Sequence, residues 1–298
     1  MKQIITIKTL WISVLALSLF ALAGCEKNVD TSAQDQLEAQ DSQTSSEADG
    51  EAEAYFNDVF DDVMGVNEEV GVGGTGIFGR PTNCPVVTVT RLTPGAAFPV
   101  RITMDFGTTG CVGRDGRTRK GKIISTYTNR LIVPGAIANT VFDGYYVDST
   151  KVEGIHKITN TGSGQIGNPP AFQYTVTVTD GKLSRPSGNF IEWNSNKVIT
   201  QVEGMITSAP VDDIFRIEGS SRGRVSRNGR ISLFETNVTE PLMKKFTCRW
   251  IVKGKIRTIR ISASLPNAWI AVLDFGTGTC DNLATVTING VTRQIILP

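Results

Sequence analysis

The residues that could do chemistry are few and lack the partners that catalysis needs. The 298-residue chain holds one histidine, His156, which lies between Ile155 and Ile158 as an ordinary strand residue would. Residues 219–223 match the Gly-x-Ser-x-Gly pattern of serine hydrolases, but a tight turn at Asn228-Gly229 follows where that motif needs a helix. A serine nucleophile needs a base, and zinc needs several ligands. We therefore expect no enzyme, no metal site and no cofactor.

Two other patterns carry weak chemical signals. Glu153 and Glu203 each stand in a Val-Glu-Gly triplet, echoed at residues 217–219, and paired carboxylates could serve a carbohydrate-active enzyme. The simpler interpretation is that each triplet ends or bulges a strand. Residues 71–76 fit Gly-x-Gly-x-x-Gly, but no strand precedes them and no helix follows, so they predict a flexible linker.

The N-terminus has the three parts of a secretory signal. Two lysines precede an apolar stretch from Leu10 to Ala23, and residues 22–25, Leu-Ala-Gly-Cys, resemble the bacterial lipobox, whose cysteine thiol takes a diacylglycerol. The apolar run of about 14 residues is shorter than the roughly 20 needed to span a bilayer. We predict a signal peptide over residues 1–24, lipid (palmitate) attachment at Cys25 and anchoring in the outer membrane of the cell envelope.

An acidic arm precedes a basic body. Residues 26–70 hold 14 acidic residues and one lysine, whereas residues 71–298 hold 27 basic and 15 acidic residues. The polar composition of residues 25–50 is typical of a disordered acidic tether. In residues 51–64 the apolar side chains share one helical stripe, so we predict a short amphipathic helix and a glycine-rich linker over 51–70. The helix would pack on the body or dock a partner.

The body, residues 71–298, has the pattern of an all-β domain. Residues 172–179 and 284–288 alternate apolar residues with threonine or other polar residues. Turn dipeptides such as Asp180-Gly181 and Asn289-Gly290 separate the alternating runs. We expect antiparallel sheets, arranged as a sandwich or an elongated meander.

The body also contains an internal pseudo-repeat. Residues 104–111 read Met-Asp-Phe-Gly-Thr-Thr-Gly-Cys and residues 273–280 read Leu-Asp-Phe-Gly-Thr-Gly-Thr-Cys. In each unit the aspartate is expected to accept backbone N–H bonds, the glycine to take positive φ and the phenylalanine to enter the core; a calcium site at the aspartate is the alternative. An earlier cysteine precedes each unit, which favours one disulfide per unit, although four cysteines allow three connectivities. The candidate cysteines are Cys84, Cys111, Cys248 and Cys280.

Basic residues crowd two predicted hairpins. The simpler interpretation is solubilising loop tips, and the alternative is an anion-binding face for an acidic polysaccharide, lipopolysaccharide phosphates or the chain's own acidic arm. Nucleic acid is not expected, because no aromatic residues interleave with the arginines. The candidate anion-binding residues are Arg114, Arg117, Arg119, Lys120, Arg222, Arg224, Arg227 and Arg230.

From residue 211 onward the chain resembles uncharacterised outer-membrane lipoproteins of Bacteroidetes. The resemblance implies a location and a β fold, and no activity. It is carried by residues 213–215 (Asp-Ile-Phe), 227–230 (Arg-Asn-Gly-Arg), 241–245 (Pro-Leu-Met-Lys-Lys), 248–252 (Cys-Arg-Trp-Ile-Val) and 273–282.

Together these patterns predict a lipid-anchored, non-catalytic binding or structural module whose basic face meets an anionic glycan or an envelope protein. Two alternatives stay open. One is a carbohydrate-active enzyme that uses carboxylates. The other is a subunit of a larger envelope assembly, which predicts an exposed apolar patch or an open sheet edge.

Overall fold

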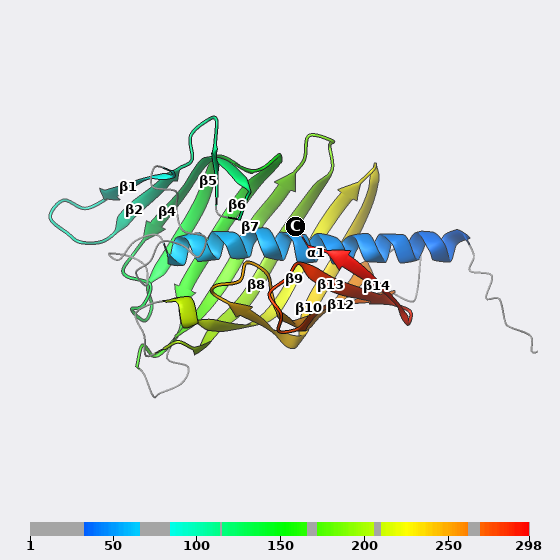
Figure 1. Ribbon diagram of the computed structural model, residues 1–298. Helices are drawn as coiled ribbons and strands as arrows, with labels where there is room; N and C mark the ends of the chain where they lie inside the picture. The colour runs from blue at the N-terminus through cyan, green and yellow to red at the C-terminus, as the bar shows by residue number, and fades with distance from the viewer. Residues whose placement is uncertain are drawn as a thin grey trace, which may run out of the picture. The chain divides into compact units, whose positions relative to one another are not determined.

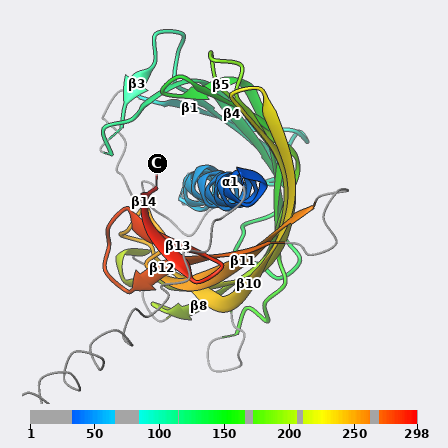
Figure 2. The same cartoon turned by 90° about the vertical axis from the view of Figure 1, so that its right-hand side faces the viewer.

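A computed structural model describes residues 33–65, 84–113, 115–165, 172–205, 210–261 and 269–297. The predicted signal peptide, Cys25, the linker glycines at 71–76 and Arg114 lie outside the described residues. Within Leu37–Pro298, one strongly curved sheet wraps around a long helix (Figures 1 and 2).

The sheet is a single antiparallel meander of 14 strands in which nearly every strand pairs with its sequence neighbours. The prediction of an antiparallel meander is confirmed, and a two-sheet sandwich is not what forms. The helices and strands are α1 (Ala33–Met64), β1 (Val86–Arg91), β2 (Val100–Asp105), β3 (Cys111–Val112), β4 (Thr118–Tyr127), β5 (Ile137–Val147), β6 (Thr150–Asn160), β7 (Gln173–Ser184), β8 (Phe190–Glu203), η1 (Pro210–Asp212), β9 (Ile214–Arg227), β10 (Arg230–Lys245), β11 (Lys253–Ile261), β12 (Ile270–Thr277), β13 (Leu283–Ile288) and β14 (Val291–Ile296).

Helix α1 corrects the expected tether. It covers 32 residues and begins at Ala33, so residues 33–50 are helical where a disordered segment was predicted, and the helix is not confined to residues 51–64. Its N-terminal half has no apolar stripe from which a helix could be predicted. A polar segment of this kind is stable as a helix only when tertiary contacts hold it. Those contacts come from the concave face of the sheet.

A line of bulges crosses the sheet and bends it around α1. Register shifts occur at neighbouring positions in successive strand pairs, among them Lys120/Lys122, Glu153/Ile155 and Lys253/Lys255. At Gly154, φ is +120° and a Cβ would lie 2.7 Å from the Cα of Gly181, so no other residue fits there. Bulges sharpen the local twist and bend a strand. The Glu-Gly triplets therefore mark bulges and strand ends, as predicted.

Both Asp-Phe-Gly-Thr segments form the predicted aspartate turn, the first directly after β2 and the second within β12 at a bulge against β11. The backbone N–H of Gly107 donates to Asp105 Oδ1 at 2.9 Å, and that of Gly276 donates to Asp274 Oδ1 at 2.9 Å. Both glycines have positive φ, and both phenylalanines of the motif are buried. The units differ further along, because Gly121 lies in a strand bulge and its counterpart Gly290 lies in a hairpin turn. A common origin of the two units stays a prediction.

Two disulfides close these regions. Cys84 is bonded to Cys111 and Cys248 to Cys280, with Cα–Cα distances of 6.2 and 5.7 Å. These are the uncrossed pairs, one in each unit. In the chain-entropy description, closing loops of 27 and 32 residues stabilises the fold by roughly 3 to 4 kcal/mol each.

Candidate functional site: an acidic helix in a basic groove

The C-terminal half of α1 enters an aromatic core. Phe56 stacks on Trp193 with ring centroids 5.5 Å apart, and Phe60 meets the edges of Tyr174 and Phe215 at 6.3 and 5.9 Å. These partners stand on β7, β8 and β9 and point to the concave face because side chains alternate along a strand. The apolar stripe read from the sequence is thus the part of the helix that fills the core.

Beside this core, one carboxylate meets three guanidinium groups. Asp58 lies 3.3 Å from Arg117, 3.7 Å from Arg119 and 3.5 Å from Arg249, and its side chain is only 5% exposed. Arg119 also binds Asp115 at 2.9 Å. Burial lowers the pKa of Arg249 from its usual value. A buried charge destabilises the fold unless an opposite charge lies beside it. Removing Asp58 would therefore leave the buried arginines uncompensated.

Two lysines make the most deeply buried ion pairs. Lys197 Nζ lies 2.9 Å from Glu53, and Lys244 Nζ lies 2.8 Å from Asp61, with all four side chains at most 4% exposed. Lys244 also donates to the carbonyl oxygen of Cys248 at 3.1 Å. Desolvation outweighs the attraction of Lys244 and raises the pKa of Asp61 to about 7.

The N-terminal half of α1 is bound mainly through polar contacts. Asp41 lies 2.7 Å from Arg230, and Glu47 lies 2.7 Å from Arg227. Two further acid–arginine pairs join the helix to the sheet, Glu38–Arg260 and Glu51–Arg185. Between them, serines rather than large apolar residues fill the interface.

Asp49 anchors the middle of the helix. It accepts hydrogen bonds from Trp193 Nε1 at 2.8 Å and from Ser221 Oγ at 2.5 Å. Ser221 is the central serine of the Gly-x-Ser-x-Gly match. It lies within β9, and its hydroxyl group donates to the helix. His156 is buried elsewhere on the concave face, 6.5 Å from the Phe56 ring, and burial lowers its pKa to about 3. Neither ring nitrogen of His156 has a hydrogen-bond partner among the described residues.

The structure places the candidate anion-binding arginines and lysine in different surroundings. Four of them point to the helix: Arg117 and Arg119 pair with Asp58, Arg227 with Glu47 and Arg230 with Asp41. Of the three anionic partners left open by the sequence, the acidic arm is the one in contact with these four.

The other candidates do not join them. Arg224 binds Glu192 at 2.8 Å, Lys120 lies 4.3 Å from the ring centre of Tyr146, and Arg222 is exposed. The eight residues therefore divide between the concave face around α1, which we call the basic groove, the rest of the sheet and the undescribed Arg114. These residues are close in sequence because they belong to two hairpins. Side chains alternate between the two faces of a strand, so neighbouring basic residues point to opposite sides of the sheet.

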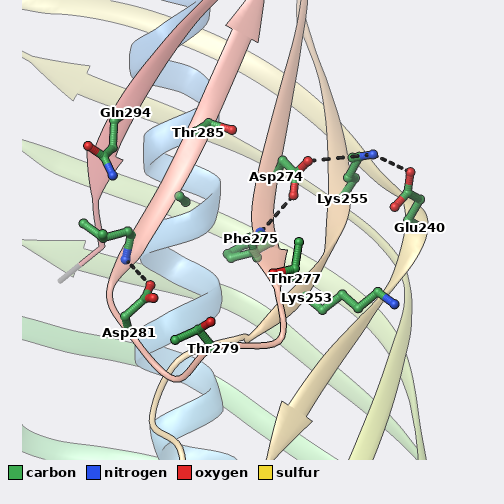
Figure 3. Close-up of a pocket in the computed structure, with 13 residues that line it drawn as sticks. Glu240, Lys253, Lys255, Asp274, Phe275, Thr277, Thr279, Asp281, Thr285 and Gln294 are labelled. Carbon is green, nitrogen blue, oxygen red and sulfur yellow. Dashed lines mark hydrogen bonds and ion pairs between the residues drawn. The ribbon is translucent and has the colours of Figure 1, made fainter.

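A polar hollow of about 470 Å³ lies at the second Asp-Phe-Gly-Thr turn (Figure 3). Lys255 Nζ lies between two of its carboxylates, 2.6 Å from Glu240 and 3.7 Å from Asp274. Asp105 in the first unit likewise pairs with a lysine, Lys122, at 3.0 Å. Because both turn aspartates are tied to a lysine and a backbone N–H, these contacts fit a structural role. The candidate carboxylates Glu153 and Glu203 do not line this hollow.

The deepest ion pairs were missed by sequence reasoning. Glu53, Lys197 and Lys244 belong to no catalytic or ligand-binding motif, and neither does Asp49, whose hydrogen bonds hold the middle of the helix. One signal pointed to these ion pairs: residues 26–70 carry a net negative charge and residues 71–298 a net positive charge. Opposite charges attract, so contact between the two segments neutralises both.

Comparison of the chain with protein-family models, curated proteins and solved structures finds no match. Among the described residues, no three histidine, cysteine or acidic side chains gather as a metal site would need. The described helical segments include none with the length and apolarity to cross a membrane.

Proposed function

We propose that this chain is a non-catalytic, lipid-anchored cell-envelope module whose basic groove takes the chain's own acidic helix as its anionic partner. One observation carries the proposal: among the described residues, seven carboxylates of α1 pair with nine cations of the rest of the chain. An external anionic glycan would have to displace those carboxylates from the same cations.

The covalent link between helix and sheet favours the internal partner. Residues 65–85 join α1 to β1, so α1 is held near the groove at a high effective concentration. A free anion must also lose translational freedom on binding, which the tethered helix does not. The groove cations therefore serve to hold the helix.

The anchor gives the helix its proposed role. Cys25 lies eight residues before Ala33, so α1 is the element through which a lipid at Cys25 would hold the sheet. The lipobox supports the lipid, and two disulfides support an oxidising compartment outside the cytoplasm. In this role, α1 is a structural fastener between the membrane and the β body.

Acyl labelling tests the anchor. Cells that express the full chain with radioactive palmitate should give a labelled protein in the membrane fraction. The variant Cys25→Ser should lose the label and leave that fraction. An unlabelled wild-type chain would overturn the anchor.

A glycan-array screen at low and high salt tests the groove. The mature chain should show no salt-sensitive binding that depends on Arg227 and Arg230. The matched variant Arg222→Ala removes an exposed arginine outside the groove. Binding to an anionic glycan that survives Arg222→Ala but disappears in Arg227→Ala/Arg230→Ala would refute the internal-partner proposal.

The free sheet edges favour a second candidate, a subunit of a larger envelope assembly. Among the described residues, β1 and β14 each pair on one side only, and open edges can accept another strand. Chemical cross-linking in intact cells, followed by mass spectrometry, should then recover links from β1 or β14 to one specific protein. Recovery of no reproducible link would remove this candidate.

A further inference from the structure

An apolar patch lies on the outer face of β10, β11 and β12. Leu233 and Ile261 are direct partners in the β10–β11 ladder, and Ile259 and Ile270 are partners in the β11–β12 ladder. Side chains two apart on a strand share a face, so Ile231 joins Leu233 there. The exposed fractions are 53% for Ile231, 48% for Leu233, 47% for Ile261 and 38% for Ile270. We call these four residues the outer patch.

The outer patch is on the opposite side of the sheet from α1. Phe234 alternates with Leu233 and is fully buried, and Arg260 alternates with Ile261 and binds Glu38 of the helix. The outer patch therefore takes no part in the core. Branched aliphatic side chains grouped on an outer sheet face are costly in water and commonly mark a contact surface.

The chain that would carry the lipid enters the body beside this patch. Asp41 of α1 pairs with Arg230, the residue before Ile231, and Glu38 pairs with Arg260, the residue before Ile261. Cys25 lies eight residues before the start of α1 at Ala33, and this stretch spans at most about 28 Å; the four helical steps to Leu37 add about 6 Å. A bilayer that holds a lipid at Cys25 is thus within reach of the outer patch.

Cations on the same outer face fit a headgroup layer. Arg222 and Arg257 have no carboxylate at ion-pair distance among the described residues, and Arg224 is partly exposed beside Leu233. Arginine side chains can extend their charge to phosphates while their apolar stems lie against acyl chains. The rim also carries two glutamates, because exposed Glu235 stands across from Arg222 and Glu192 pairs with Arg224. An aliphatic centre flanked by three arginines and two glutamates is still compatible with an interfacial membrane contact.

A second copy of the chain fits this surface less well. A stable interface buries about 800 Å² on each partner, and four side chains, each about half exposed, fall well short of that area. Insertion into a bilayer has no such threshold, because partitioning increases with each apolar side chain that is buried and each cation that meets an anionic headgroup.

We propose that the outer patch is a membrane-contact surface that lays the outer face of β10–β12 on the bilayer to which the chain is anchored. This inference rests on the proposed lipid at Cys25. The patch adds a second, reversible contact to that anchor, and it fixes which face of the sheet is turned to the lipid.

Vesicle flotation tests the surface separately from the anchor. The full mature chain with Cys25→Ser is mixed with vesicles of phosphatidylethanolamine and phosphatidylglycerol, and the floated fraction gives a partition coefficient. Ile231→Ser/Leu233→Ser should lower this coefficient at least fivefold. The matched control Val86→Ser/Val89→Ser removes exposed valines from β1 at the other end of the sheet and should leave it unchanged.

Each outcome decides between sources of attachment. Equal flotation of the patch variant and its control, or no flotation of the parent chain, overturns the membrane-contact proposal even if palmitate labels Cys25. Loss of a dimer in the patch variant, seen by sedimentation without vesicles, would assign the outer patch to a second copy and also overturn it. Circular dichroism and thermal melting of both variants verify that the fold is intact.

Discussion

The two halves of α1 contact the same sheet by different means. Residues 51–64 bury a stripe of aromatic and branched side chains, among them Phe56 and Phe60, whereas residues 38–50 bury Ser42, Ser45 and Ser46 with a series of carboxylates. Burial of apolar area stabilises at about 25 cal/mol per Å², while ion pairs recover little beyond the cost of dehydrating their charges. The comparison teaches that one continuous helix can be held firmly at one end and loosely at the other.

The largest expected effect comes from cutting the aromatic contact. Phe56→Ala should lower the free energy of unfolding by about 3–5 kcal/mol, because a buried ring is lost and a cavity remains. Ser46→Ala, equally buried in the other half, should change it by less than about 1 kcal/mol, since Ser46 Oγ has no hydrogen-bond partner among the described residues. Urea unfolding with intact disulfides measures both. Similar losses in the two variants would show that the halves are held equally.

A charge deletion should give the next largest effect. Asp58→Asn leaves three buried arginines facing a neutral amide and should cost about 3 kcal/mol. Asp41→Asn removes a carboxylate from the partly exposed Arg230 and should leave the free energy of unfolding nearly unchanged. The same urea titrations compare them. A larger loss in Asp41→Asn than in Asp58→Asn would reverse the proposed order of the two halves.

Groups in and around the C-terminal half of α1 should also determine how the free energy of unfolding depends on pH. The folded pKa of Asp61 is about 7, above its unfolded value of 3.8, so its stabilising contribution is present at low pH and is lost as the pH rises through about 7. His156 has a folded pKa of about 3, below its unfolded 6.5, so its contribution is present above pH 6.5 and is lost as the pH falls toward 3. Each slope is at most about 1.4 kcal/mol per pH unit.

The two pH ranges overlap, and the two slopes have opposite signs. Between about pH 4 and 7 Asp61 makes the free energy of unfolding fall as the pH rises, and between about pH 3 and 6.5 His156 makes it rise. Asp61→Asn should therefore make the free energy of unfolding rise more steeply from pH 4 to 7, and His156→Phe should make it fall over the same range, with thermal melting across pH as the measurement. If Asp61→Asn leaves the curve between pH 4 and 7 as it is in the wild type, the pKa of Asp61 is not raised in the folded state.

The smallest effect concerns local opening. Amide hydrogen exchange should be faster in residues 38–47 than in residues 55–64, and 1 M salt should widen the difference. Salt screens the partly exposed pairs Asp41–Arg230 and Glu47–Arg227 more than it weakens aromatic packing. Exchange measured by mass spectrometry resolves the two segments. Uniform protection along α1 would mean that the helix opens as one unit.

The elements that the sequence predicted well are those with local patterns. Alternation, turn dipeptides and the repeated Asp-Phe-Gly-Thr segment anticipated an antiparallel sheet, the aspartate turns and the uncrossed disulfides. Each depends on residues within a short stretch of chain, such as Asp105 and Gly107. The bulges at Glu-Gly triplets belong to the same class, since a glycine with positive φ determines them locally.

The N-terminal half of α1 could not be predicted, because its stability lies outside its own sequence. The composition of residues 33–50 predicts disorder, and their helix is held by contacts with distant residues such as Arg227, Arg260 and Trp193. The partners of the basic residues could not be predicted for the same reason. Two arginines on one hairpin, Arg224 and Arg227, have different partners, because which of them faces the helix depends on strand register.

The position of α1 ahead of the strands has a consequence for how the molecule folds. Glu38 and its partner Arg260 are 222 residues apart, whereas the strands pair with near neighbours through short loops. Local hairpins close quickly, and contacts of high sequence separation form late. During synthesis the acidic helix therefore emerges before the strands and docks after they have paired. Until β11 is in place, Glu38 is hydrated without its cation, and the concave face of the growing sheet is open to other anions in its surroundings.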